Sequence, residues 1–336
     1  MLNIETIKKY DSQKICDVYN NWPELAKSSF FTDLPKLDLK NIDHIVFAGM
    51  GGSGTIGDVI SSILSKTDVH VSVTKGYLLP KTVDKNTLVV VTSVSGNTKE
   101  SLTILEKSFR SEAHTVAFSS GGKIMDFCQK NNITHFKISE IHSPRGSFTS
   151  FLYSILNVME YFLPIKKTDI EESIKILEQT KLEISSFNLS KNNPALNLAC
   201  WITQIPIIYY PCGFQSVAIR FKNSLQENAK THVIVEDVIE ACHNSIVSWE
   251  GKQNVQPILI QGVDDYIKTQ ERWGVLRDFF NSKTISYYEI SSVNGNIISK
   301  IINLIYMLDY ASIYNALINE IDPNPVQSIN YVKNLI

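Results

Sequence analysis

Short apolar runs punctuate the first half of the chain, and each ends at glycine or polar residues. The first occupies residues 44–48 and reads H-I-V-F-A. Further strand candidates are residues 70–74, 87–92, 115–118 and 134–138. Runs of this length suit strands that are buried on both faces of a parallel sheet. Apolar residues at helical spacing lie between them, notably at 55–65 and 99–109, so the pattern predicts alternating strands and helices.

The same alternation restarts in the second half of the chain. Long helices are predicted at residues 147–162 and 166–186, and the second of these is charged and amphipathic. Further helices are predicted at 196–203 and 217–230, and further strands at 206–210, 232–235, 256–261 and 284–290. The expected fold class is therefore α/β, with two domains that are each a doubly wound parallel sheet flanked by helices.

Domain boundaries follow from these elements. The expected segments are an N-terminal helical segment (1–40), a first domain (41–163), a linker helix (164–193), a second domain (194–320) and a C-terminal tail (321–336). Pro23 and Pro35 are expected to interrupt the N-terminal segment. Two domains also fit the length of 336 residues.

Charge and cysteine content disfavour several classes of protein. The chain has 32 lysines and arginines against 34 aspartates and glutamates, a balance that argues against a nucleic-acid partner. Its five cysteines are scattered and never form C-x-x-C, which disfavours a disulfide framework or a zinc ribbon and favours a reducing compartment. The N-terminus carries no recognisable targeting signal, and the apolar segment 297–317 contains Lys300 and Asp309. We expect that segment to be an amphipathic helix packed on a core, and the protein to be soluble, cytoplasmic and without a membrane partner.

A glycine-rich loop follows the first predicted strand. Residues 49–54 read G-M-G-G-S-G and precede a predicted helix, so backbone N–H groups there can approach an anion. The loop also matches the dinucleotide fingerprint G-x-G-x-x-G, which requires an acid at the end of the second strand. That strand ends V-T-K-G at 73–76, so NAD is disfavoured as a cofactor. A tight turn without a ligand remains the other alternative.

A second loop, rich in hydroxyl groups, follows the strand at 87–92. Residues 93–98 read S-V-S-G-N-T, and a helix N-cap would need only one such side chain. The loop lacks G-K-[ST], so it is not a nucleotide P-loop. Loops at the carboxyl ends of strands in one parallel sheet converge on one crevice. A small phosphorylated ligand is therefore the first choice.

The two loops together resemble the sugar isomerase (SIS) domain. Further blocks follow in order: S-P-R-G at 143–146, L-Q-E-N-A-K at 225–230, E-A-C-H-N at 240–244, and D-P at 322–323 leading to Lys333. This ordered set, over residues 45–336, resembles the bifunctional phosphoglucose/phosphomannose isomerases. The resemblance implies two SIS domains, a homodimer, a sugar phosphate as substrate, no metal and no cofactor.

The resemblance also implies a reaction and its catalytic residues. Glucose 6-phosphate, and mannose 6-phosphate with less support, would be interconverted with fructose 6-phosphate through a cis-enediol(ate). Glu227 matches the family's base, and a carboxylate suits this role because its conjugate acid can return the proton. His243 matches the ring-opening histidine, which acts from the neighbouring subunit. An unperturbed histidine, with a pKa of about 6.5, can exchange protons at physiological pH.

The remaining matches concern substrate contacts. Lys333 matches a C-terminal lysine that reaches the sugar ring oxygen or a hydroxyl, and Arg145 matches an arginine near C1 and C2. A fixed positive charge there would stabilise the enediolate. The phosphate and hydroxyl contacts match Gly52, Ser53, Ser93, Ser95 and Thr98. Val326 stands where dual-specificity members have a threonine, so mannose 6-phosphate is the less expected substrate.

Two other functions stay open. One is a non-catalytic SIS regulator that binds a sugar phosphate; the first 40 residues are too short and too weakly basic for a helix-turn-helix unit, which disfavours it. The other is an SIS isomerase for a different sugar phosphate, such as arabinose 5-phosphate. Those enzymes usually have a single SIS domain, and some use clustered histidines as metal ligands, a cluster this sequence lacks.

Overall fold

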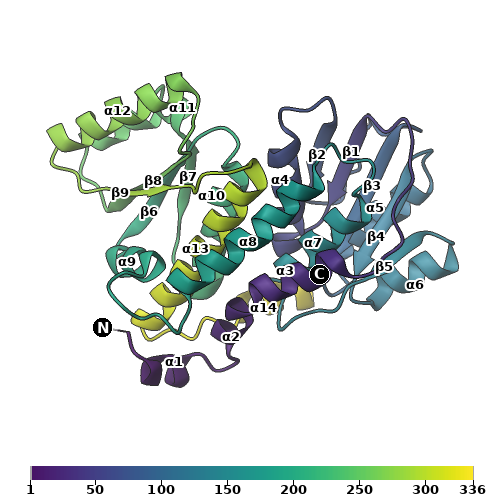
Figure 1. The fold of residues 1–336 in the computed structure, drawn as a ribbon, viewed down its shortest axis with the longest axis horizontal. Coiled ribbons are helices and arrows are strands. Elements are labelled where there is room, and N and C mark those ends of the chain that lie inside the picture. The colour runs from purple at the N-terminus through teal and green to yellow at the C-terminus, as the bar shows by residue number, and fades with distance from the viewer. Residues whose placement is uncertain (1, 336) are drawn as a thin grey trace. The chain divides into compact units, whose positions relative to one another are not determined.

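The computed structural model describes residues 2–335 and divides the chain into two units. Unit 1 combines Met1–Asn20 with Ile176–Ile336, and unit 2 is Asn21–Lys175. Each unit is built around one sheet with helices on its faces (Figure 1). The boundaries at residues 20 and 175 fall inside the N-terminal segment and the linker helix expected from the sequence. The helix α8 (Lys167–Ile184) runs across the second boundary.

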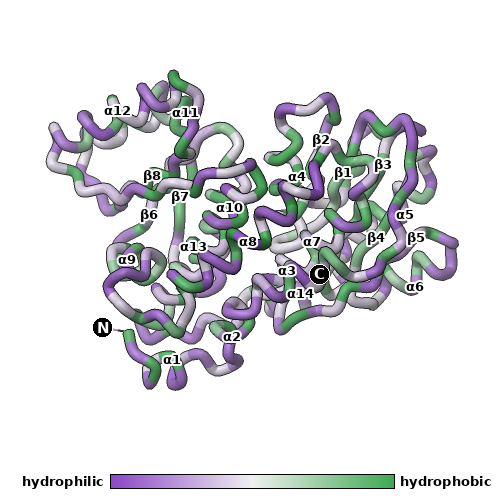
Figure 2. Tube along the Cα trace, in the orientation of Figure 1, coloured by the Kyte–Doolittle hydropathy of each residue, from purple (hydrophilic) through white to green (hydrophobic). Residues whose placement is uncertain are grey.

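The sheet of unit 2 has five strands, and all of its neighbouring strands run parallel. The strands are β1 (His44–Ala48), β2 (His70–Thr74), β3 (Thr87–Ser93), β4 (His114–Ser119) and β5 (Thr134–Lys137), in the order β2-β1-β3-β4-β5. Every residue of β1 and β3 is buried, and their apolar centres are green in Figure 2. The pairing of the strands confirms the predicted parallel sheet. The two strands are apolar without alternation because both of their faces are covered.

Five helices lie wholly within unit 2. They are α3 (Trp22–Phe31), α4 (Gly51–Leu64), α5 (Lys99–Phe109), α6 (Gly122–Lys130) and α7 (Phe148–Val158). Pro23, expected to interrupt a helix, instead lies in the first turn of α3, where its missing N–H breaks no intrahelical hydrogen bond. The α7 helix is buried along its whole length and packs on α3, where the rings of Trp22 and Phe148 lie 5.8 Å apart.

Unit 1 contains a four-stranded sheet that is also parallel throughout. Its strands are β6 (Ile205–Tyr210), β7 (Ile234–Asp237), β8 (Val255–Gln261) and β9 (Tyr288–Ser291), in the order β7-β6-β8-β9. The last strand begins four residues later than the predicted 284–290. Thr284 has a φ of 55°, a left-handed conformation that does not continue a strand.

The helical elements of unit 1 come from both ends of the chain. They are α1 (Ile4–Tyr10), α2 (Ile15–Asn20), α9 (Pro194–Trp201), α10 (Gln215–Ser224), the π-helix η1 (Leu225–Ala229), α11 (Val238–Ala241), the 3-10 helix η2 (Ser245–Glu250), α12 (Ile267–Ser282), α13 (Ile297–Ile318) and α14 (Gln327–Leu335). The α12 helix was not expected from the sequence. It buries Trp273, Leu276 and Phe280 at helical spacing, but charged residues and a glycine interrupt the pattern around them.

The α13 helix is long and apolar enough to cross a membrane, but 89% of its most apolar window is buried within the fold. It therefore packs on the core as predicted, although it is not amphipathic. The two charged residues expected on its polar side, Lys300 and Asp309, are buried at 7% and 0% exposure. Each has an ionic partner, Asp264 for Lys300 and Arg220 for Asp309, which makes burial of the charges possible.

Close packing of α4 on β1 gives a first testable prediction. A Cβ atom added to Gly57 would lie 2.6 Å from the Cβ atom of Phe47, which is backbone-fixed, so Gly57→Ala must push helix and strand apart. We expect a loss of about 1–3 kcal/mol in the free energy of unfolding, measured by urea denaturation. Gly274→Ala in α12 is the control, because nothing lies within 4 Å of the added atom. It should raise stability by about 0.4–1 kcal/mol. A Gly57→Ala protein as stable as wild type would contradict the packing argument.

Candidate functional site

The glycine-rich segment 49–54 forms a strand-to-helix transition. The sequence suggested a loop through residue 54, but α4 already begins at Gly51. Its first turn is closed by the N–H groups of Ser53 and Gly54, which donate to the carbonyl of Met50 at 3.1 and 3.2 Å. The N-cap residue Met50 makes no side-chain cap, so the start of α4 keeps the partial positive charge of a helix N-terminus. An anion can bind there.

The hydroxyl-rich loop follows β3 and leads into α5. The Ser93 and Thr98 hydroxyls lie 2.9 Å apart, and the N–H of Gly96 donates to the Ser93 hydroxyl at 3.1 Å. Gly96 has a φ of 67°, and a Cβ atom there would come within 1.7 Å of the Gly121 carbonyl oxygen. Only glycine fits this position, so the loop has one fixed shape. Ser95 is exposed at its tip.

One hydrogen bond joins the two loops. The N–H of Val94, just after β3, donates to the Ser53 hydroxyl at 3.2 Å in the first turn of α4, which follows the adjacent strand β1. The structure therefore brings together the five residues expected to contact phosphate and hydroxyl groups. We call this set the glycine–serine cluster: Gly52, Ser53, Ser93, Ser95 and Thr98. It offers hydroxyl groups and helix N–H groups at the carboxyl edge of one parallel sheet.

The end of β2 does not suit a dinucleotide. Thr74 is followed by Lys75, whose ammonium group pairs with Asp58 on α4. Burial raises the pKa of Asp58, and the hydrogen bond from Lys75 opposes that shift. A ribose would need a carboxylate at the tip of this strand, where the structure has a cation. The literal G-x-G-x-x-G match therefore does not make this an NAD site.

Arg145 lies in a tightly tied loop between β5 and α7. The Ser147 hydroxyl bonds back to the carbonyls of Ile141 and Ser143, and Trp22 donates its indole N–H to the carbonyl of Gly146 at 3.1 Å. Arg145 itself is only 5% exposed. Its guanidinium is thus a positioned charge at the start of α7, in the same unit as the glycine–serine cluster.

Glu227 lies in unit 1, in the π-helix η1. The sequence predicted one α-helix over 217–230, but α10 ends at Ser224 and the next five residues form a π turn. Such turns are rare and occur often at functional sites. Lys230 ends the turn with a φ of 58°, and its ammonium donates to the carbonyls of Glu227 at 2.7 Å and Asp322 at 3.2 Å. The Glu227 side chain is half-buried.

His243 and Lys333 are both exposed on unit 1. His243 follows α11, which is capped by the carboxylate of Asp237 on the N–H groups of Ile239 and Glu240. Burial raises the pKa of the neighbouring Cys242 thiol, which disfavours the reactive thiolate. Lys333 lies on α14, shortly after Val326. The residues of the glycine–serine cluster thus lie together in unit 2. The other three expected catalytic residues lie in different parts of unit 1: Glu227 in η1, His243 after α11 and Lys333 in α14.

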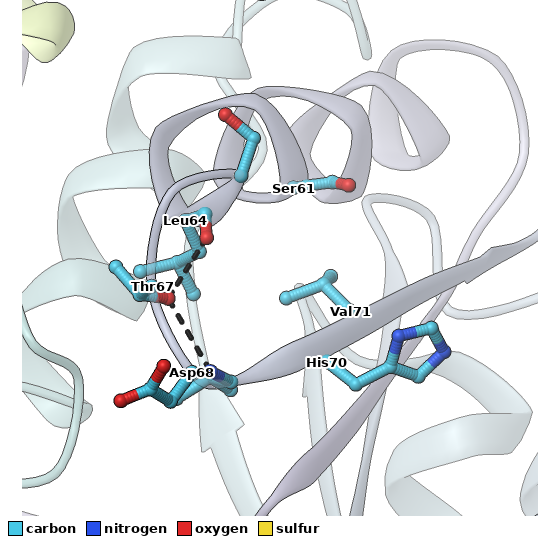
Figure 3. Close-up of a pocket in the computed structure, with 8 residues that line it drawn as sticks. Ser61, Leu64, Thr67, Asp68, His70 and Val71 are labelled. Carbon is cyan, nitrogen blue, oxygen red and sulfur yellow. Dashed lines mark hydrogen bonds between the residues drawn. The ribbon is translucent and has the colours of Figure 1, made fainter.

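A hollow of about 360 Å³ in unit 2 lies away from these residues (Figure 3). It is lined by the end of α4 and the start of β2: Ser61, Leu64, Ser65, Thr67, Asp68, Val69, His70 and Val71. The Thr67 hydroxyl there bonds to the carbonyl of Leu64 and the N–H of Val69. The hollow is at the amino end of β2, whereas ligands of parallel sheets bind at the carboxyl ends. Within residues 2–335, no three His, Cys, Asp or Glu side chains gather as metal ligands would.

Comparisons with known proteins decide the family. The model of the bacterial phospho-glucose isomerase C-terminal SIS domain matches residues 191–336, and the SIS domain model matches residues 38–159. A bifunctional phosphoglucose/phosphomannose isomerase of Caldicellulosiruptor bescii is 30% identical over 311 residues, which cover 88% of this chain and 90% of that protein. This chain belongs to the bifunctional phosphoglucose/phosphomannose isomerase family. Membership makes the protein a sugar-phosphate isomerase.

The chain is also similar to two further proteins in sequence and to a solved structure in fold. The Thermoplasma acidophilum protein of the same name is 30% identical over 87% of this chain and 89% of its own length. A D-glucosamine-6-phosphate 4-epimerase of Sulfolobus acidocaldarius is 26% identical, covering 73% of this chain and 76% of that protein. The crystal structure of a hypothetical protein from Thermus thermophilus has a TM-score of 0.71 and 13% identity, covering 99% of this chain and 89% of that one. At that identity it supports the two-sheet SIS fold alone.

Proposed function

We propose that this member of the phosphoglucose/phosphomannose isomerase family interconverts glucose 6-phosphate with fructose 6-phosphate, and mannose 6-phosphate more slowly. The observation that carries the proposal is the glycine–serine cluster, in which the Val94–Ser53 hydrogen bond joins two donor-rich loops, and we assign the substrate phosphate to these loops. Neutral hydroxyls and helix N–H groups suit a phosphate dianion on a small molecule. Val326, in place of a threonine, is the reason for ranking mannose 6-phosphate second.

Proton transfer is assigned to Glu227. In the open-chain aldose its carboxylate removes the proton from C2, the C–H electron pair forms the C1–C2 double bond, and the π pair of the C1 carbonyl moves onto O1 to give the enediolate. The proton on O2 then passes to O1, the O–H electron pair forms the C2 carbonyl, and the C1–C2 π pair takes the proton back from the carboxyl at C1. Both protons stay within the substrate and Glu227, so no other reactant is needed. Arg145, a buried positive charge, would stabilise the negative oxygen during these steps.

Ring opening is assigned to His243 and Lys333. A base takes the proton from the hydroxyl on C1 while an acid protonates the ring oxygen, which breaks the C1–O5 bond. His243 can serve as the base or acid, and Lys333 can donate to the ring oxygen or a hydroxyl. Both side chains are exposed, so a sugar can reach them from solvent.

Replacing the base tests the assignment of Glu227. Glu227→Gln keeps the size of the side chain but cannot accept the proton, so kcat should fall by about 10²–10⁴-fold. Turnover of glucose, mannose and fructose 6-phosphates is measured by coupled assay in EDTA. Glu271→Gln, an exposed acid on α12, is the control and should match wild type.

Each possible result of these assays points to one function. A Glu227→Gln enzyme as fast as wild type refutes this base. A folded wild type that binds these sugars without turnover indicates the regulator, and turnover only of other sugar phosphates, such as arabinose 5-phosphate or glucosamine 6-phosphate, indicates a different isomerase.

Substitution in the hydroxyl-rich loop tests phosphate binding. Ser95→Ala removes an exposed hydroxyl from the glycine–serine cluster, and we expect KM for the sugar phosphate to rise about tenfold with little change in melting temperature. Ser65→Ala is the matched control, because Ser65 is also exposed but lies at the opposite end of α4. Equal KM values for both variants would argue against the cluster as the phosphate site.

We also propose that the enzyme is a homodimer in which His243 of one subunit serves the site of the other. Mixing and refolding equal amounts of Glu227→Gln and His243→Ala chains tests this. Half of the dimers would be mixed, and one site in each mixed dimer would be intact, which restores about a quarter of wild-type activity. A mixture no more active than its two components would exclude a shared site.

A further inference from the structure

The π-helix that carries Glu227 is attached at both ends to one turn of α13. At its N-terminal end, the hydroxyl of Ser224 donates to the carboxylate of Asp309 at 2.6 Å. At its C-terminal end, the amide of Asn228 donates to the hydroxyl of Ser312 at 2.8 Å. We call these four residues the α13 clamp. Glu227 lies between the two attachment points, directly before Asn228.

The part of the clamp on α13 is itself held firmly. The Ser312 hydroxyl donates to the carbonyl of Asp309 at 2.6 Å, which fixes its direction. The Asp309 carboxylate also accepts from Arg220 at 2.7 Å and from the hydroxyl of Tyr19 at 3.0 Å. All four clamp residues are at most 2% exposed. A buried carboxylate with this many donors has one position, because moving it would leave charges without partners.

A clamp at this place has a physical purpose. A π turn inserts an extra residue into a helix, and its hydrogen bonding is less favourable than that of an α-helix. Without outside contacts, residues 225–229 would relax toward α-helical bonding, and every side chain in the turn would change direction. A displacement of about 1 Å at a reacting group can cost about a hundredfold in rate. Contacts that preserve the π turn therefore also preserve the direction of Glu227.

We propose that Asp309 and Ser312 are positioning residues for Glu227: through Ser224 and Asn228 they keep η1 in its π form and the Glu227 carboxylate in its reactive orientation. Neither residue needs to touch the substrate. This inference rests on the proposed role of Glu227 as the base.

The chain provides a closely matched pair of serines for the test. Ser312→Ala removes one hydroxyl of the clamp and leaves the ion pair of Asp309 in place. Ser173→Ala is the control: Ser173 is also fully buried, donates to the carbonyl three residues before it at 2.6 Å, and bonds one side chain, Tyr153, at 2.7 Å. Both variants should therefore lose similar thermal stability. Ser312→Thr retains the hydroxyl and serves as the rescue variant.

Two measurements on these proteins test the inference. We expect Ser312→Ala to reduce kcat at least tenfold with KM within twofold of wild type, Ser312→Thr to recover most of kcat, and Ser173→Ala to match wild type. Hydrogen exchange, which needs no activity, should be faster at the amides of residues 225–230 in Ser312→Ala only. If Ser312→Ala shows unchanged exchange at residues 225–230, or a kcat equal to that of Ser173→Ala, the proposed positioning role is refuted. Failure of the proposed base is seen separately, as wild-type activity in Glu227→Gln.

Discussion

The parallel direction of every strand pair constrains both units. Parallel neighbours cannot be joined by a tight turn, so each strand must be followed by a crossover, most often a helix. The chain therefore leaves every strand at the same edge of its sheet, and the loops that begin helices gather there. In unit 2 this rule brings Ser53 to Val94, the residue after Ser93, because β1 and β3 are adjacent in the sheet though far apart in the chain. A site made of two loops follows directly from the topology.

Glu227 does not lie in a loop at the carboxyl end of a strand, so other contacts must fix its position. It lies at the end of α10, a helix that has already run back from the carboxyl end of β6, so no strand end supports it. Support comes from α13, whose charged residue Asp309 is fully buried and paired with Arg220. An unpaired charge at such a depth would be strongly destabilising. The Arg220–Asp309 ion pair thus allows α13 to be buried on all sides. It also fixes the carboxylate to which Ser224, at the start of the π turn, is bonded.

The sequence predicts an element well where its residues form a continuous pattern, and poorly where other residues interrupt that pattern. The β1 and β3 runs were located correctly, because strands buried on both faces are apolar throughout. The α12 helix was missed, because Gly274 and several charges interrupt its three buried positions. The π turn could not be predicted, since no periodicity distinguishes five residues of π-helix from the end of an α-helix. The loop motifs predicted that the two loops approach each other, which the Val94–Ser53 hydrogen bond confirms, whereas their binding of phosphate stays a prediction. Glu227 was noticed only through family resemblance.

The two sheets differ in what their carboxyl edges can bind. After β3 the chain presents hydroxyls, but after β8 it presents Asp264 and Asp265. The carboxylate of Asp265 accepts hydrogen bonds from the N–H groups of Gly262 and Trp273, and these bonds hold the loop after β8. Burial raises the pKa of Asp265. Asp264 pairs with Lys300, so both carboxylates are engaged within unit 1, whereas the glycine–serine cluster offers hydroxyl groups and a helix N-terminus, which suit a phosphate dianion. The near balance of charge over the whole chain conceals this contrast, because a single substrate phosphate depends on local donors rather than on net charge. The two sheets thus differ in the groups they position: unit 2 carries the proposed phosphate site at the carboxyl edge of its sheet, and unit 1 carries the proposed base, Glu227, after α10.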